Sequence, residues 1–92
     1  MEIVNWTRQV AIPLLTLTRH AEDMLIERGI ERAWVEATIS HPDTVESDPM
    51  RPGVVRAFRK IAERDSRSLR VVYIQNSDKI RVLTAFFDRG RR

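Results

Sequence analysis

Two stretches near the start of the chain repeat their apolar residues at the 3.6-residue period of an α-helix. Residues 19–28 follow Thr18, a residue type that caps helix starts, and precede Gly29, which suits the left-handed conformation at a helix end. Residues 31–40 continue the period until Pro42 stops it. The pattern predicts two consecutive short helices.

Outside these helices the apolar residues alternate with polar ones, as they do in a half-buried β-strand. The strand-like runs cover residues 10–17, 43–48, 54–61, 69–75 and 79–87. Pro13 places the first run at a sheet edge or bulge, and the turn at 76–78 joins the last two runs into an antiparallel hairpin. The predicted fold is α+β in the order β-α-α-β-β-β-β, with both helices packed on one face of a mostly antiparallel sheet of four or five strands.

The length and composition indicate one globular domain over residues 1–92. The chain is 42% hydrophobic and 32% charged, which excludes a disordered or fibrous protein. A chain of this size buries only about two thirds of the surface that its unfolded form exposes. Because an enclosed cofactor pocket would remove much of so small a core, we expect an open surface site.

The chain contains no cysteine and only two histidines. This excludes disulfides, thiolate metal sites and cysteine nucleophiles, and we expect neither a metal ion nor a cofactor. The longest apolar run, residues 10–15, is far shorter than the roughly 20 residues of a membrane-spanning helix. The first residues also lack the pattern of a secretory signal, so the expectation is a cytoplasmic protein that does not enter the membrane.

Charge is distributed unevenly between the two halves of the chain. Residues 1–46 contain four Arg against eight Asp and Glu, whereas residues 47–92 contain twelve Arg and Lys against five acids. Only Lys60 and Lys79 among the basic residues are not Arg, and the planar guanidinium suits phosphate and carboxylate groups. A genome that favours arginine codons explains Arg in place of Lys equally well, but it explains the asymmetry less easily.

The predicted hairpin has a defined register, because its turn sets Gln75 opposite Ile80. Alternation then divides the hairpin into two faces. The face expected to form the core beneath the helices carries Leu69, Val71, Tyr73, Ile80, Val82, Thr84 and Phe86. The opposite face carries Arg70, Val72, Ile74, Arg81, Leu83, Ala85 and Phe87. The first face is assigned to the core because the second carries Arg70 and Arg81, and burying an unpaired arginine would cost several kcal/mol.

The strand before the hairpin divides in the same way, although Arg59 breaks its alternation and indicates a sheet edge or a bulge. Its core residues are Val55, Ala57 and Ile61, and its opposite residues are Arg56, Phe58 and Lys60. The face away from the helices therefore displays cations around an apolar centre. The cations are Arg56, Lys60, Arg70 and Arg81, and the apolar residues are Phe58, Val72, Ile74 and Leu83.

Cations beside an aromatic ring are suited to hold a phosphate backbone and to stack a base. The alternative is a solvated sheet face whose basic side chains pair with nearby acids. The apolar residues of this face approach the patch size that usually marks an interaction site. We therefore expect nucleic acid, a partner chain or a second copy of the protein to cover it.

His20 is the other candidate for chemistry, because it lies at the start of the first predicted helix. The positive end of the helix dipole disfavours an imidazolium, so His20 is biased towards the neutral form that accepts a proton. A capping or packing role is the alternative. His41 lies next to Pro42 at the end of the second predicted helix. We interpret it as a helix-end residue with no catalytic role.

Several short motifs share the order and spacing of a known family. They are His20-Ala21, Arg28-Gly29-Ile30, Val35, Pro42-Asp43, Arg70-Val71-Val72-Tyr73 and Val82-Leu83-Thr84. Over residues 17–87 the chain resembles the bacterial family labelled domain of unknown function 4258, which is similar in fold to the RelE/ParE superfamily of small basic toxins, with which the BrnT toxins also group. The resemblance implies two helices on a curved antiparallel sheet and an acidic antitoxin as partner. In the RelE branch it implies cleavage of messenger RNA without a metal ion.

The resemblance also implies roles for individual residues. The side chains that would bind the scissile phosphate and stabilise its charge are Arg56, Lys60, Arg70 and Arg81. The side chain that would accept the proton of the attacking 2′-hydroxyl is His20 or Tyr73. The chain departs from the family pattern at Met24, where an Arg is expected four residues after the His. Tyr73, in addition, falls on the predicted core face.

Two classes of function remain open on this scaffold. The first is a toxin-like protein of a toxin–antitoxin system, acting as a metal-independent mRNA endoribonuclease or as an RNA-binding protein. The alternative is a non-catalytic protein-interaction module, as in gyrase-directed ParE relatives, or a homodimer of uncharacterised role. RNA and an acidic antitoxin are the partners of the first class, and a protein or a second copy is the partner of the other.

Overall fold

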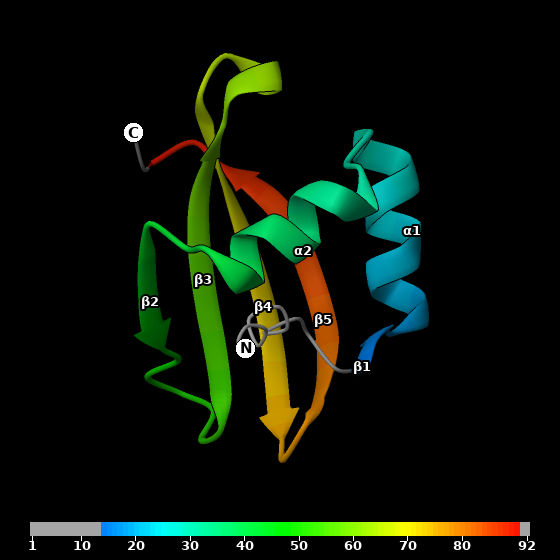
Figure 1. Cartoon of the computed structure of the whole chain (residues 1–92), viewed down its shortest axis with the longest axis vertical. Helices are drawn as coiled ribbons and strands as arrows, with labels where there is room; N and C mark the ends of the chain where they lie inside the picture. Colours follow the sequence, from blue (N-terminus) through cyan, green and yellow to red (C-terminus); the bar gives the residue numbers. More distant parts are fainter. Residues whose placement is uncertain (1–13, 91–92) are drawn as a thin grey trace, which may run out of the picture.

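The computed structural model describes residues 14–90, which form an α+β fold (Figure 1). Its elements are β1 (Leu14–Leu17), α1 (Arg19–Arg28), α2 (Arg32–Ser40), β2 (Thr44–Ser47), β3 (Val54–Ile61), the short 3₁₀-helix η2 (Ala62–Arg64), β4 (Arg67–Asn76) and β5 (Lys79–Asp88). The five strands form one sheet in the order β1-β5-β4-β3-β2. Only β1 and β5 are parallel, and the other neighbours are antiparallel. The predicted fold class is confirmed.

Both helices begin and end close to where their sequence signals predict. The Thr18 hydroxyl accepts a hydrogen bond from the Ala21 N–H at 3.0 Å, which satisfies one of the free donors at the start of α1. Gly29 has a φ of 63° and ends α1 in the left-handed conformation. α2 starts after Glu31 and ends before His41, so Pro42 lies just beyond it.

The first strand is seen only in part. β1 covers the second half of the predicted run at 10–17, and the positions before Leu14, Pro13 among them, lie outside the described residues. Only Thr18 separates β1 from α1, and its N–H donates to the Val82 carbonyl at 3.0 Å. This bond continues the pairing with β5 up to the start of the helix. α1 therefore runs beside β5 at the sheet edge, whereas α2 crosses β3 and β4 (Figure 1).

One apolar core joins the helices to the sheet. Its buried residues are Ala21, Leu25, Ile30, Val35, Ala57, Ile61, Leu69, Val71, Tyr73, Ile80, Val82 and Ala85. Arg59 projects towards this side and donates from Nη1 to the carbonyl of His41 at 2.7 Å. The side chain that breaks the alternation of β3 thus binds the C-terminal end of α2, where a cation is favourable.

The predicted register of the hairpin is confirmed at the turn, but it is wrong further along β5. Gln75 pairs with Ile80 as predicted, but the pairing shifts at Val72 and Tyr73, which lie opposite Thr84 and Val82. Leu83 is therefore an extra residue, and such a β-bulge reverses the alternation beyond it. Two residues change sides in each direction: Ala85 and Phe87 face the core, and Thr84 and Phe86 face the opposite side.

Candidate functional site

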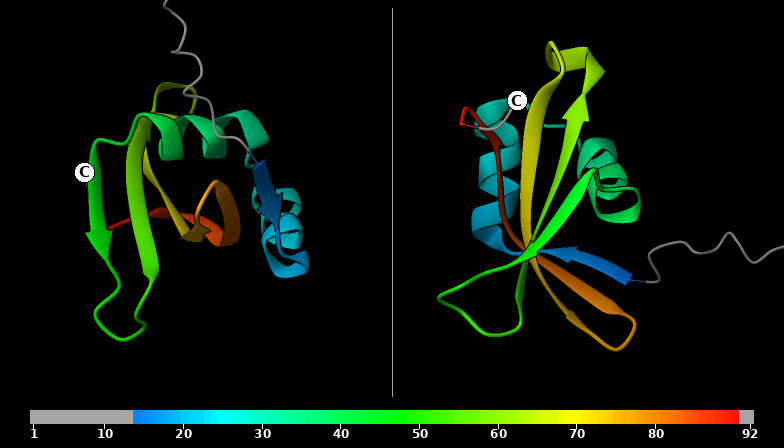
Figure 2. Two further views of the ribbon diagram at one scale, coloured as in Figure 1. Left: turned by 60° about the horizontal axis from the view of Figure 1, so that its bottom comes forward. Right: turned by 90° about the vertical axis from the view of Figure 1, so that its left-hand side faces the viewer.

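The four predicted cations lie on one face of the sheet. Residues that pair directly across neighbouring strands share a face, and the pairs are Arg56 with Val72, Lys60 with Ser68, Arg70 with Phe58, and Arg81 with Ile74. We call the side of the sheet away from α2 the basic face. In Figure 2 the connection between β2 and β3 projects to this side, and α2 lies on the other.

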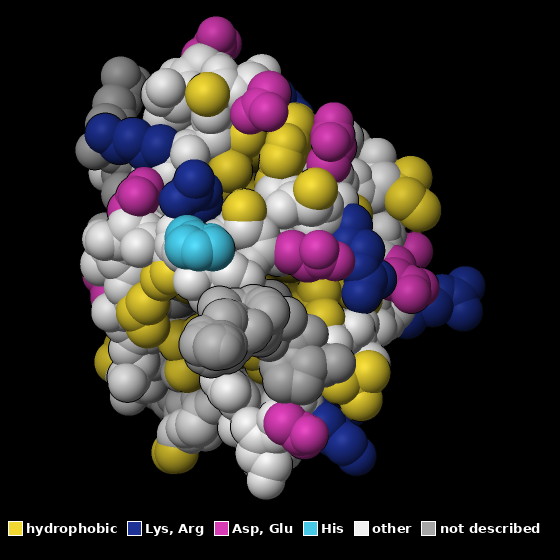
Figure 3. All heavy atoms as spheres, in the orientation of Figure 1, with side chains coloured by type: hydrophobic (Ala, Val, Ile, Leu, Met, Phe, Trp, Pro, Cys, Tyr) yellow, Lys and Arg dark blue, Asp and Glu magenta, His cyan; other side chains and the backbone are white. Residues whose placement is uncertain are grey.

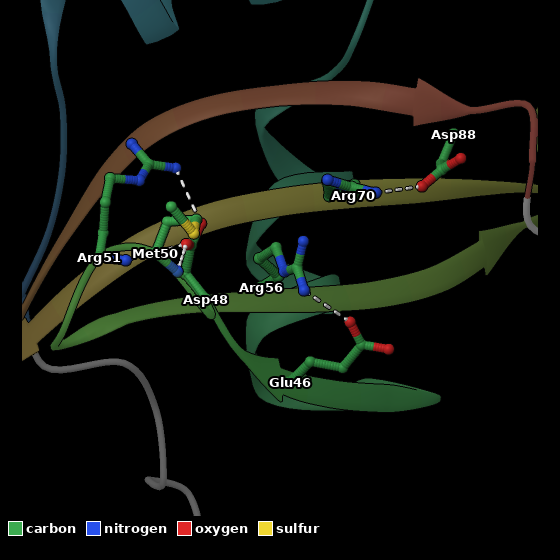
Figure 4. A network of polar contacts seen from close by, with 7 residues as sticks. All are labelled: Glu46, Asp48, Met50, Arg51, Arg56, Arg70 and Asp88. Atoms are coloured by element: carbon green, nitrogen blue, oxygen red, sulfur yellow. Dashed lines mark hydrogen bonds and ion pairs between the residues drawn. The ribbon is translucent and has the colours of Figure 1, made fainter.

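Arg70 is the cation of the basic face with the most contacts to its neighbours. Its guanidinium carbon lies 5.2 Å from the ring centre of Phe58 and 5.0 Å from that of Phe86. These rings belong to the strands on either side of β4, so three strands together build one cation–aromatic cluster. Nη2 of Arg70 also binds Oδ2 of Asp88 at 2.6 Å (Figure 4). The plane of the guanidinium is therefore held from several sides.

Acidic side chains neutralise two of the four cations. Arg70 pairs with Asp88, and Arg56 pairs through Nη2 with Oε1 of Glu46 at 3.1 Å (Figure 4). The Arg56 side chain is 22% exposed and that of Glu46 34% exposed, so this pair is half-buried. Each arginine binds its carboxylate through Nη2, and its Nε is buried without a hydrogen-bond partner among the described residues. The guanidinium groups are thus neutralised but incompletely hydrogen-bonded.

A third arginine–carboxylate pair orders the connection between β2 and β3. Asp48 accepts from the Met50 N–H at 2.8 Å and the Arg51 N–H at 3.1 Å, and its other oxygen binds Nη2 of Arg51 (Figure 4). The Met50 N–H contributes most to holding the pKa of the Asp48 carboxyl below its usual value of 3.8. The carboxylate therefore stays charged at neutral pH, where it binds Met50 and Arg51 within the connection.

Lys60 and Arg81 supply the remaining charge of the basic face. Both side chains are exposed, and neither forms an ion pair with another residue in the range 14–90. They are far apart, because Arg81 lies opposite Ile74 near the hairpin turn and Lys60 lies near the far end of β3. The cations are thus spread along the face instead of converging on one point.

The apolar patch expected to require a partner is mostly covered within the chain. Phe58 is 1% exposed and Val72 is 3% exposed, while Ile74 and Leu83 are half-buried. The guanidinium of Arg70 lies against the ring of Phe58 and covers part of this patch. The expectation of a large bare apolar surface is therefore wrong.

α1 brings two further side chains to the edge of the basic face. Nε2 of His20 lies 3.3 Å from Oγ1 of Thr84, and the guanidinium of Arg28 lies 6.0 Å from the ring centre of Phe86. These residues share one stripe of the helix with Met24, at intervals of four positions. The approach of α1 to this face was not predicted, because only the bulge in β5 turns Thr84 and Phe86 to this side.

Tyr73 lies among the core residues on the other side of β4 from Arg70. It is 7% exposed, and burial raises the pKa of its phenol above the ordinary value of 10.0. A phenol with a raised pKa stays protonated at neutral pH. The structure therefore brings His20, but not Tyr73, to the basic face.

Residues 14–90 contain no group of three or more His, Cys, Asp or Glu side chains that is placed to hold a metal ion. No helix within the same range is long and apolar enough to cross a membrane. The model of one family, described as Domain of unknown function (DUF4258), matches residues 17–87. No curated protein and no solved structure matches the chain.

Proposed function

Since the chain belongs to the DUF4258 family, whose description assigns no activity, we propose its function from the geometry: a toxin-like protein that binds RNA with the basic face. The observation that carries the proposal is the cluster around Arg70. A guanidinium held against Phe58 and Phe86 offers a pre-oriented plane on which a base stacks and N–H groups that bind phosphate.

The carboxylate partners of Arg56 and Arg70 are compatible with this role. Each pair engages its arginine through a single nitrogen and leaves part of the guanidinium side chain exposed. A phosphate that approaches the face replaces the carboxylate or binds Nη1 beside it. Lys60 and Arg81, which have no described ion pair, add net positive charge at the two ends.

Metal-independent cleavage is the finer form of the proposal. In this form His20, exposed at the start of α1 and 3.3 Å from the Thr84 hydroxyl, accepts the proton of an attacking 2′-hydroxyl. The 2′-oxygen then forms a bond to phosphorus as the bond from phosphorus to the 5′-oxygen breaks, the departing 5′-oxygen takes a proton from water, and a 2′,3′-cyclic phosphate remains. Arg70 and Arg28 stabilise the charge that develops on the phosphate. Tyr73, the other acceptor considered, is buried on the opposite side, so the geometry favours His20.

Single-stranded RNA binding tests the proposal directly. We expect Arg70→Ala and Arg81→Ala each to weaken binding by about 10-fold, equivalent to about 1.4 kcal/mol, and to lower the salt slope by about 0.7 for each phosphate that the variant no longer neutralises. Arg67→Ala is the matched control, since Arg67 is exposed on the other side of β4, where it lies over the ring of Phe87. Equal effects of all three variants, or no binding at moderate salt, would contradict the proposal.

The cleavage step has its own test. Induction of the protein should halt translation and leave transcripts with discrete new ends. His20→Ala should abolish the new ends while RNA binding stays within about 2-fold, because the change removes a proton acceptor and no permanent charge. New ends that persist in this variant would remove His20 from the mechanism.

A non-catalytic protein-interaction module is the second candidate. It is favoured by the internal pairing of Arg56 with Glu46 and of Arg70 with Asp88, which reduces the charge available to phosphate. This candidate predicts normal growth on induction, no retained RNA, and capture of a protein partner such as an acidic antitoxin or a second copy. The RNA-binding experiment therefore separates the two candidates.

A further inference from the structure

A pocket of about 270 Å³ lies at the hairpin end of the basic face. It is lined by Leu14, Thr16, Ile74, Asn76, Lys79, Ile80 and Arg81. These residues come from β1, β4 and β5, whose pairing sets Leu14 opposite Lys79 and Thr16 opposite Arg81. The pocket is therefore built on three strands and not on a loop.

The lining combines three kinds of chemistry. Leu14 is 47% exposed, one of the large apolar side chains that the structure leaves open to solvent, and the half-buried Ile74 lies on the same face. Lys79 and Arg81 are exposed cations with no ion pair inside the range 14–90. Asn76 adds an amide that both donates and accepts hydrogen bonds. An apolar wall, a hydrogen-bonding edge and two cations thus meet in one small space.

We propose that this pocket binds a single nucleotide of the bound RNA strand. The base lies against Leu14 and Ile74, the Asn76 amide bonds the edge of the base, and Lys79 and Arg81 bind the phosphate. An inorganic anion would leave the apolar wall unused, and an apolar ligand would leave two cations desolvated without a partner. The volume of the pocket lies just below the range of pockets for drug-sized ligands, and this size suits a single nucleotide.

The position of the pocket agrees with a strand that follows β4. The outward residues of β4 are Arg70, Val72, Ile74 and Asn76. At about 3.3 Å per residue they extend over roughly 20 Å, from the Arg70 cluster to the pocket. The inference rests on the proposed function, because it requires one RNA strand to occupy both the Arg70 cluster and the pocket.

Titration of the full chain with nucleoside 5′-monophosphates, followed by amide chemical shifts, tests the pocket independently of longer RNA. We expect millimolar binding, with shifts concentrated at Leu14, Ile74, Asn76 and Lys79. The matching nucleoside and inorganic phosphate, used as probes of each half of the ligand, should bind at least about 10-fold more weakly. Arg81→Ala and Lys79→Ala should each weaken binding about 5-fold or more, and Arg81→Lys should keep most of it.

The controls separate this inference from the proposed function. Arg67→Ala, at the end of β4 away from the pocket and on the other side of that strand, should leave mononucleotide binding unchanged. Arg70→Ala should reduce binding of an RNA oligomer but not of a mononucleotide. An oligomer that binds through Arg70 while no mononucleotide shifts the pocket residues overturns the pocket and leaves the proposed function standing. Equal binding of phosphate alone, or equal competition by an acidic peptide, also overturns it, because the pocket would then be a general anion site.

Discussion

At the scale of single residues, the basic face is defined as much by its carboxylates as by its arginines. Asp88 holds Nη2 of Arg70, and Glu46 holds Nη2 of Arg56. Under the proposed function, each acid competes with an incoming phosphate for the same donor. A carboxylate in this position would then lower the affinity for RNA while it keeps the guanidinium in place.

Replacing Asp88 by Asn tests this competition. Asp88→Asn removes the negative charge but keeps an oxygen that accepts from the Gly90 N–H, as Oδ1 does at 2.9 Å. We expect RNA affinity to rise about 3- to 10-fold at low salt, since Arg70 loses its internal counter-charge. The measurement is a fluorescence-anisotropy titration.

The matched control is Asp23→Asn, which makes the same charge change on the exposed surface of α1. A general effect of net charge would raise affinity equally in both variants. Unchanged or lower affinity in Asp88→Asn would mean that the ion pair only holds Arg70 in place. Competition between the Asp88 carboxylate and RNA phosphate would then be rejected.

At the scale of elements, the junction of β1, α1 and β5 places His20 and Arg28. Thr18 caps α1 through its hydroxyl oxygen and donates from the same hydroxyl to the Leu83 carbonyl at 3.2 Å, at the bulge itself. One side chain thus links the start of the helix to the irregular part of the strand.

Thr18→Ala should lower the free energy of unfolding by about 1–2 kcal/mol, because it removes both the cap and the bond to Leu83. Urea denaturation measures this loss. Thr18→Ser keeps the hydroxyl and should recover most of the stability. If the serine variant were as unstable as the alanine variant, the methyl group and not the hydroxyl would be the important contact.

The elements themselves were largely predictable from the chain, whereas the site was predictable only in part. Caps and periodicity indicate the bounds of α1 and β3, because these signals are local. The extra residue Leu83 leaves no trace in an alternating pattern, so Thr84 and Phe86 were assigned to the wrong face. The acids that pair with Arg56 and Arg70 lie 10 and 18 residues away in the chain, and their identity depends on strand register.

At the scale of the whole molecule, the sheet separates a packing side from a side with free and paired cations. The two helices carry four of the eight acidic residues of the N-terminal half, and acidic and basic side chains are mixed on the α2 side (Figure 3). Lys60 and Arg81 project from the other side. The basic residues predicted for the sheet therefore lie on the side away from α2, where Glu46 and Asp88 neutralise part of their charge.

Tyr73→Phe tests this separation of the two sides. Tyr73 lies in the core, so loss of its hydroxyl should leave RNA binding and any cleavage within about 2-fold of the wild-type values, in contrast to Arg70→Ala. Loss of cleavage with retained folding and RNA binding would instead make the phenol a catalytic group.

The most direct measurement is a map of the surface that RNA contacts. Titrating a single-stranded RNA oligomer into the full chain at low salt and following amide and arginine side-chain NMR signals locates the contact residue by residue. The account predicts shifts along the outward positions of β3, β4 and β5, centred on Arg70 and extending to Arg81. Shifts centred on α2, or none at all, would contradict it.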